Sequence, residues 1–169
     1  HKEALLDKIR LLYVGRISAE KGIYNFIKMF NEIKNQFEFS IVGNLEKYKI
    51  FNNNINLINY VSDTKKLISI YDKNNITILP SYTEGSPNVV NESLSRKRPV
   101  IIFEDIDYII KDKKGIFVSK RDPKSFTETA KNIIENYRDI QNEMEKNVLP
   151  TKKNMIKQIS DIIESEVFN

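Results

Sequence analysis

Two glutamates flank a candidate helix start near the middle of the chain. Glu84 and Glu92 stand on either side of a Gly-Ser-Pro sequence at 85–87, which follows an apolar run at 76–80 that predicts a short buried strand. Proline favours the first turn of a helix, because its fixed φ and missing N–H cost nothing there. The backbone amides of such a turn can hold a phosphate or align sugar hydroxyls. The segment therefore predicts a polar ligand at the carboxyl end of a strand.

The residue types in this loop suit a nucleoside sugar. A glycine at 85 lets a ligand approach the backbone closely, and Glu92 stands one helical step after Asn88, so that both side chains project from the same face. A carboxylate can accept two hydrogen bonds side by side, which fits the vicinal diol of a ribose. The alternative is that both glutamates only favour an early helical turn. That alternative leaves the Gly-Ser-Pro unexplained. The candidate amide donors are those of Gly85, Ser86, Asn88 and Val89.

A second loop adds two cations. The apolar run at 9–14 predicts a buried parallel strand, and it ends in the sequence GRISAEKG at 15–22. Arg16 offers a fork for phosphate oxygens and Lys21 a point charge, and the short turn between them would let both converge on one anion. The loop could also be an ordinary connection with solvated charges. If the strand order is 3-2-1-4-5-6, however, both unusual loops face one crevice at the switch point of the sheet.

These motifs resemble a known family. The patterns G-R-x-x-x-x-K-G at 15–22, P-S-x-x-E-G-x-P-x-x-x-x-E at 80–92 and P-V-I at 99–101 are similar to the nucleotide-sugar-binding half of retaining GT-B glycosyltransferases, family 4 or group 1, with its two-glutamate motif. The similarity runs from about Ile9 to the C-terminal helices. It implies an α/β fold with a Rossmann-like, doubly wound parallel sheet of about six strands, which is one half of a GT-B fold.

The resemblance also implies roles for individual residues. It places the donor diphosphate on Arg16 and Lys21, beside Gly15, and the donor sugar on Glu84 and the amides after it. Glu84 is then the candidate catalytic residue, and Glu92 binds the ribose hydroxyls. The donor would be a UDP-sugar or a GDP-sugar, with no metal or other cofactor. For base contacts we expect Tyr60 and Val61, at the end of the third predicted strand.

Three segments depart from the family pattern. The stretch 95–98 is bulky and basic where family members have small residues, the stretch 103–107 is acidic and lacks glycine, and the turn after the second strand is reduced to 43–44. The missing glycines favour an alternative, a nucleotide-sugar-binding module without catalysis. A further alternative is half of a GT-B-type sugar-nucleotide epimerase. Asp105-Ile106-Asp107 resembles a metal-binding D-x-D, but a solvated acidic loop is the preferred interpretation because that motif is short and common.

Length and composition favour one domain. The chain has 169 residues, 40% of them hydrophobic, which suits a single donor-binding domain over 1–169. It begins at His1 without a methionine, so we expect an acceptor-binding N-terminal domain upstream, for a glycan or lipid-linked acceptor. No cysteine is present and the one histidine is His1, which excludes a thiolate nucleophile, a disulfide framework, a histidine triad and a two-histidine zinc site.

Charge patterning narrows the partners. The net charge is +4 and the pI about 9.1, but basic and acidic residues are interspersed without an aromatic-lined basic stripe, so no nucleic acid is expected. We interpret the surface as solvated, with a peripheral membrane contact of the full-length enzyme as the alternative. No apolar run has the length of a membrane span and no signal peptide is visible. We therefore expect a cytoplasmic protein, and the family resemblance implies an enzyme of cell-surface polysaccharide biosynthesis.

The remaining pattern predicts the other elements. Further strands are expected at 37–42, 55–61, 100–103 and 115–118, and Ser62-Asp63 and Asp122-Pro123 should each begin a helix. The predicted core-facing residues of the helices are Tyr24, Ile27, Phe30 and Ile33; Leu67, Ile68 and Tyr71; Phe126, Ala130, Ile133, Ile134 and Tyr137; and Ile156, Ile159, Ile163 and Val167.

Overall fold

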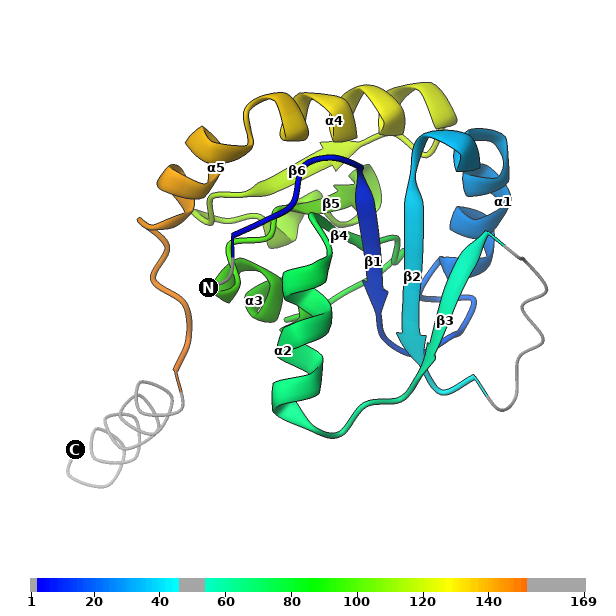
Figure 1. Cartoon of the computed structure of the whole chain (residues 1–169), viewed down its shortest axis with the longest axis horizontal. Coiled ribbons are helices and arrows are strands. Elements are labelled where there is room, and N and C mark those ends of the chain that lie inside the picture. The colour runs from blue at the N-terminus through cyan, green and yellow to red at the C-terminus, as the bar shows by residue number, and fades with distance from the viewer. Residues whose placement is uncertain (1–2, 46–53, 152–169) are drawn as a thin grey trace, which may run out of the picture.

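The six strands in the described part of the chain form one parallel sheet. A computed structural model describes residues 3–45 and 54–151, so the predicted helix at 156–167 lies outside the described residues (Figure 1). The strand order is β3-β2-β1-β4-β5-β6, which confirms the predicted order and the α/β class. The strands are β1 Arg10–Val14, β2 Glu38–Gly43, β3 Ile55–Asn59, β4 Ile76–Leu79, β5 Val100–Phe103 and β6 Ile116–Ser119.

Helices cover both faces of the sheet. The helices are α1 Ile23–Ile33, α2 Thr64–Lys73, α3 Asn88–Ser95, α4 Pro123–Glu135 and α5 Tyr137–Met144, with 3₁₀ turns at Lys34–Gln36 and Glu104–Ile109. Helices α1 and α4 pack on one face, and α2 and α3 on the other (Figure 1). At the β6 edge, α5 joins the two layers, because Tyr137 belongs to the core under α1 and α4 and Met144 to the core under α3. Strands β4 and β5 are buried along their whole length, as expected for apolar runs covered on both faces.

Aromatic packing fixes the face under α1 and α4. Phe26 of α1 meets Phe39 of β2 and Phe126 of α4 with ring centroids 5.3 and 5.1 Å apart. Both contacts are edge-to-face, the arrangement that aromatic rings favour. Of the predicted α1 stripe, Phe30 is buried and Tyr24 only partly buried.

Most helix starts lie where the sequence predicts them. Asp63 accepts a hydrogen bond from the amide of Lys66 at 2.6 Å, and Asp122 accepts one from the amide of Ser125 at 2.8 Å. The prediction for Ile68 was wrong, because its exposed fraction is 37% while Ile70 is buried. A helix presents positions three and four apart to the sheet, and residue 68 falls outside the 67, 70, 71 stripe.

Smaller corrections concern element ends. Pro87 is extended, with ψ of 114°, and precedes α3 as its N-cap instead of starting it. Strand β3 ends at Asn59, so Tyr60 and Val61 lie in the loop that follows it. Both shifts leave the two-loop arrangement at the carboxyl edge of the sheet intact.

The basic stretch before β5 is structural. Arg96 donates two hydrogen bonds to the Asp72 carboxylate, at 3.0 and 2.7 Å, and Arg98, only 1% exposed, donates to the Asp72 carbonyl at 3.0 Å. Lys97 has a φ of 53°, a conformation that favours glycine. These residues join α2 to α3 before β5 begins, whereas the two candidate loops lie beyond the carboxyl ends of β1 and β4. This departure from the family pattern therefore lies away from the candidate site.

Candidate functional site

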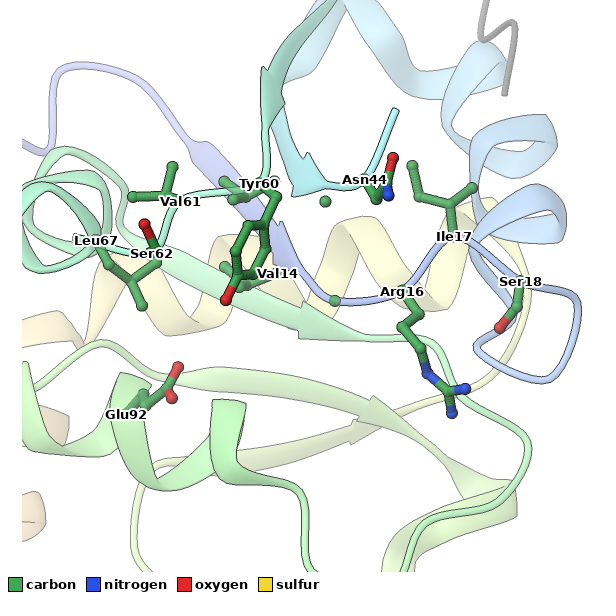
Figure 2. Close-up of a pocket in the computed structure, with 13 residues that line it drawn as sticks. Val14, Arg16, Ile17, Ser18, Asn44, Tyr60, Val61, Ser62, Leu67 and Glu92 are labelled. Carbon is green, nitrogen blue, oxygen red and sulfur yellow. The ribbon is translucent and has the colours of Figure 1, made fainter. Parts of the chain in front are cut away.

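A cavity of about 680 Å³ opens at the carboxyl edge of the sheet. Loops after β1, β2 and β3 form most of its walls, and α3 contributes Glu92 (Figure 2). We call this the larger cavity, to distinguish it from a smaller one described below. Tyr60 and Glu92 point toward the same space from opposite sides of it, and Arg16 lies away from them at the far end of the cavity (Figure 2). The residues that line it are Val14, Gly15, Arg16, Ile17, Ser18, Val42, Gly43, Asn44, Tyr60, Val61, Ser62, Leu67 and Glu92.

The larger cavity combines apolar walls with a few polar groups. Val14, Val42 and Leu67 supply aliphatic surface, and Tyr60, which is 73% exposed, offers the face of its ring. Such a combination suits a flat, partly polar ligand, because ligand sites are mostly apolar with a small number of placed polar groups.

A buried tyrosine orients Glu92. The Tyr71 hydroxyl donates a hydrogen bond to Glu92 Oε2 at 2.8 Å, and Tyr71 itself is 2% exposed. Burial, and next the negative charge of Glu92, raise the pKa of Tyr71, so its hydroxyl stays protonated and remains a donor. Glu92 is thus held as an oriented acceptor at the cavity wall.

A smaller cavity of about 150 Å³ adjoins the larger one. Val14 and Gly15 line both. The smaller cavity also contains Lys21 from the loop after β1, Glu84 from the loop after β4, and Asn88 and Val89 from α3. Because β1 and β4 are hydrogen-bonded neighbours, the strand order brings the two loops together as the sequence predicts.

Glu84 is held by two donors in this smaller cavity. Lys21 Nζ lies 2.7 Å from Glu84 Oε1, and the Ser81 hydroxyl donates to the same oxygen at 2.6 Å. The Glu84 side chain is 7% exposed and that of Lys21 22%. The pair is therefore shielded from water, and its attraction is stronger than that of a surface ion pair.

Arg16 lies in a different environment from Lys21. Its guanidinium pairs with Glu20 at 2.9 Å, and its side chain is 77% exposed. Each of the two predicted phosphate-binding cations is thus paired with a glutamate, and they line adjoining cavities. Their convergence on one anion stays a prediction.

Glycines hold the two loops close together. Gly22 has a φ of 64°, and a Cβ built there would lie 1.8 Å from the Pro80 carbonyl oxygen. Next to this contact, the Tyr82 amide donates to the Glu20 carbonyl at 3.0 Å. A Cβ on Gly43 would lie 2.5 Å from the Gly15 carbonyl oxygen, so the short turn after β2 also needs its glycine.

Gly85 and Ser86 lie apart from these cavities. They border a third hollow, of about 30 Å³, together with Lys111 and Lys113. A Cβ on Gly85 would meet no atom within 4 Å, so this glycine fills no packing requirement in the structure. Their predicted role toward a sugar stays a prediction.

We expected the acidic segment after β5 to be a solvated loop, but its Asp105 forms an ion pair. Asp105 lies in the 3₁₀ turn Glu104–Ile109, and its Oδ2 accepts a hydrogen bond from Arg121 Nε at 2.7 Å. Sequence reasoning missed Arg121, which stands just before the predicted helix start at Asp122. Among residues 3–45 and 54–151, no group of three or more metal-ligating side chains could hold a metal ion.

The fold is the Rossmann-like α/β fold of GT-B glycosyltransferases. It superposes on sucrose-phosphate synthase from Thermosynechococcus elongatus with a TM-score of 0.75 and 16% sequence identity, over 95% of this chain and 46% of that one. It also superposes on Anabaena Alr3699/HepE, solved in complex with UDP and glucose, with a TM-score of 0.64 and 13% identity, over 82% of this chain and 42% of that one. At these identities the likeness concerns the fold alone.

The family itself is shown by sequence. Residues 8–136 match the model for glycosyl transferases group 1, and the chain belongs to this family. It is 30% identical over 150 residues to the capsular polysaccharide biosynthesis glycosyltransferase CapM of Staphylococcus aureus, which covers 79% of this chain and 39% of CapM. It is 27% identical over 96 residues to the putative teichuronic acid biosynthesis glycosyltransferase TuaC of Bacillus subtilis, over 57% of this chain and 25% of TuaC. The chain thus spans less than half the length of these relatives.

No helix in the described part of the chain is both long and apolar enough to cross a membrane.

Proposed function

We propose that the chain is the donor-binding half of a retaining glycosyltransferase that transfers a hexose-type sugar from a nucleoside diphosphate. Family membership supports the enzyme class. The observation that carries the proposal is the pair of adjoining cavities at the β1 and β4 ends, one with Tyr60 and Glu92 and the other with Lys21 and Glu84. Val14 and Gly15 line both cavities, which supports a donor whose nucleoside and sugar lie on either side of a diphosphate bound there.

The larger cavity would hold the nucleoside of a UDP-sugar or GDP-sugar. Tyr60 can stack on a base, because any base presents a π face to an exposed aromatic ring. Glu92, oriented by Tyr71, would accept hydrogen bonds from the two ribose hydroxyls. Val61 would contribute backbone contacts to the edge of the base.

The diphosphate would lie beside Gly15, between Arg16 and Lys21. Both cations are now paired with glutamates, so binding exchanges a carboxylate partner for phosphate oxygens. This exchange matters most at Lys21, because its departure would leave the Glu84 carboxylate with the Ser81 hydroxyl as a donor and free to accept hydrogen bonds from sugar hydroxyls.

Stabilisation of the charge on the leaving group would then lower the barrier to transfer. As the bond between the sugar and the diphosphate breaks, negative charge grows on the leaving phosphate, and fixed cations and helix amides close to it stabilise the transition state. In this proposal Arg16, Lys21 and the start of α3 supply that charge without a metal. Glu84 orients the reacting sugar.

Transfer also needs a site for the acceptor. Because the chain spans less than half of its relatives, we propose that an N-terminal domain of the full-length protein binds a glycan or lipid-linked acceptor. The names of CapM and TuaC support a role in cell-surface polysaccharide biosynthesis. We propose that the enzyme works on the cytoplasmic side of a membrane. The 169-residue chain alone should then bind donor without transferring sugar, because orientation of the acceptor is missing.

Calorimetric titration of the chain with UDP, GDP and ADP tests the binding half of this proposal. UDP or GDP should bind at a single site, and Glu92→Gln should weaken that binding. If neither UDP nor GDP binds, the proposal is wrong. Sugar transfer by the full-length protein tests the other half, and nucleotide binding without any transfer would indicate the non-catalytic module instead.

A further inference from the structure

We propose that Arg121 is a positioning residue for the loop that carries Glu84. The inference rests on the proposed function, because it gives Arg121 a role at the sugar end of that site. Arg121 lies between the end of β6 and the start of α4, far along the chain from Glu84, and none of the recognised motifs includes it.

All three guanidinium nitrogens of Arg121 donate a hydrogen bond. Nη1 donates to the Pro80 carbonyl at 2.9 Å and Nη2 to the Ser81 carbonyl at 2.8 Å, while Nε donates to Asp105 at 2.7 Å. The two carbonyls belong to consecutive residues, so the planar fork of an arginine matches them as a single amine could not.

Two aromatic rings hold the guanidinium in place. Its central carbon lies 4.1 Å from the centroid of Tyr82 and 4.5 Å from that of Phe103. Contacts of this kind stabilise a cation over a ring. Arg121 thus joins the segments that follow β4, β5 and β6, and its side chain is only 25% exposed.

The hydrogen bonds lead directly to Glu84. Ser81 accepts from Arg121 through its carbonyl and donates to Glu84 Oε1 through its hydroxyl. From the other side, the Tyr108 hydroxyl accepts from the Glu84 amide at 3.0 Å and donates to the Glu84 carbonyl at 2.7 Å. Arg121 fixes one end of the short segment 80–84 and Tyr108 fixes the other, so the Glu84 carboxylate has little freedom to turn.

This arrangement also explains the acidic residue after β5. Asp105 orients Arg121, and Arg121 in turn compensates a negative charge close to the segment that carries Glu84.

Amide hydrogen exchange of the chain tests the positional effect without any ligand. The amides of Tyr82 and Glu84 are both hydrogen-bonded, so their exchange reports opening of the loop. Arg121→Met should speed exchange at these two amides by about tenfold while β1 and β5 amides stay unchanged, which is local opening, and Arg121→Lys should give a smaller effect. The matched control is Arg138→Met, because the Arg138 side chain is 85% exposed. Unchanged exchange at both amides, or an equal increase through the whole core, would overturn the inference.

Ligand binding separates positioning from general support. In Arg121→Met the affinity for the free nucleoside diphosphate should stay within about twofold, and that for the matching nucleotide sugar should fall by about tenfold, because only the sugar contacts depend on Glu84. Asp105→Asn should add almost nothing in the Arg121→Met background, since the two residues act as one unit. Equal loss for both ligands would overturn the positioning role. A wild-type chain that binds no nucleotide would overturn the proposed function and the sugar-site role with it, whereas normal binding with unchanged exchange would reject only Arg121.

Discussion

Lys21 Nζ lies 2.7 Å from Glu84 Oε1, although the two residues are 63 positions apart in the chain. The ion pair joins the loop after β1 to the loop after β4. It therefore connects the proposed phosphate-binding residue Lys21 to the proposed sugar-binding residue Glu84. Lys21 cannot neutralise a diphosphate at full strength and keep Glu84 as its partner. Donor binding should therefore release Glu84 as it engages Lys21.

The first prediction concerns Lys21. Lys21→Ala should weaken binding of the nucleoside diphosphate by about 1 to 3 kcal/mol, the usual range for a lost charged hydrogen bond. Calorimetry of the folded chain measures this, with Lys131→Ala, an exposed lysine of α4, as the control. Equal affinities for the wild type and Lys21→Ala would remove Lys21 from the site.

The second prediction separates the two glutamates. Glu92→Gln should weaken binding of the free nucleoside diphosphate and of the full donor alike, because both contain the ribose. Glu84→Gln should leave the affinity for free diphosphate unchanged or raise it, since Lys21 loses a competing partner, and it should lower turnover of the full-length enzyme. The assignment would be wrong if Glu84→Gln abolished diphosphate binding and Glu92→Gln had no effect.

The third prediction uses two glycines with opposite surroundings. Gly22→Ala should lower the free energy of unfolding by about 1 to 3 kcal/mol, because the left-handed backbone strains an alanine and its Cβ would strike Pro80. Gly85→Ala should change it by less than about 0.5 kcal/mol, as at an ordinary surface site. Denaturant unfolding gives both values. Equal losses would show that Gly22 does not set the distance between the loops.

The fourth prediction concerns alkaline pH. Burial raises the pKa of Tyr13, Tyr71 and Tyr137, with the charge of Glu84 adding to the effect at Tyr13 and that of Glu92 at Tyr71. In the unfolded chain these tyrosines ionise near 10.0, so their contribution to stability is complete below that pH and falls as the pH rises above it. Ultraviolet titration should show at least three of the eight tyrosines ionising only with alkaline unfolding. Eight equivalent tyrosines in the folded chain would contradict these burial assignments.

The sequence predicts local features of the fold better than contacts between distant segments. Continuous apolar runs such as 100–103 predict buried strands well, because both faces of the sheet are covered. The side chain of Ile68 was misplaced because one residue on a short helix separates the packed face from the exposed one. Asp63 could be identified as a cap from its neighbours alone.

Long-range pairing in the site could not be predicted. Nothing in the sequence around Glu84 indicates that Lys21 is its partner. Arg121 contacts the Pro80 carbonyl only because the assembled sheet brings the segments after β6 and β4 together. The charged segments at 95–98 and 103–107 depart from the family pattern, but their partners, Asp72 and Arg121, become visible only when the strands are in place.

A crystal structure of the chain soaked with UDP or GDP tests the central claim most directly. We expect the ribose on Glu92, the base beside Tyr60, and the diphosphate near Gly15, with Lys21 moved from Glu84 to the phosphate oxygens. A nucleotide bound anywhere else, or one in the larger cavity whose diphosphate points away from Lys21 and Arg16, would contradict it.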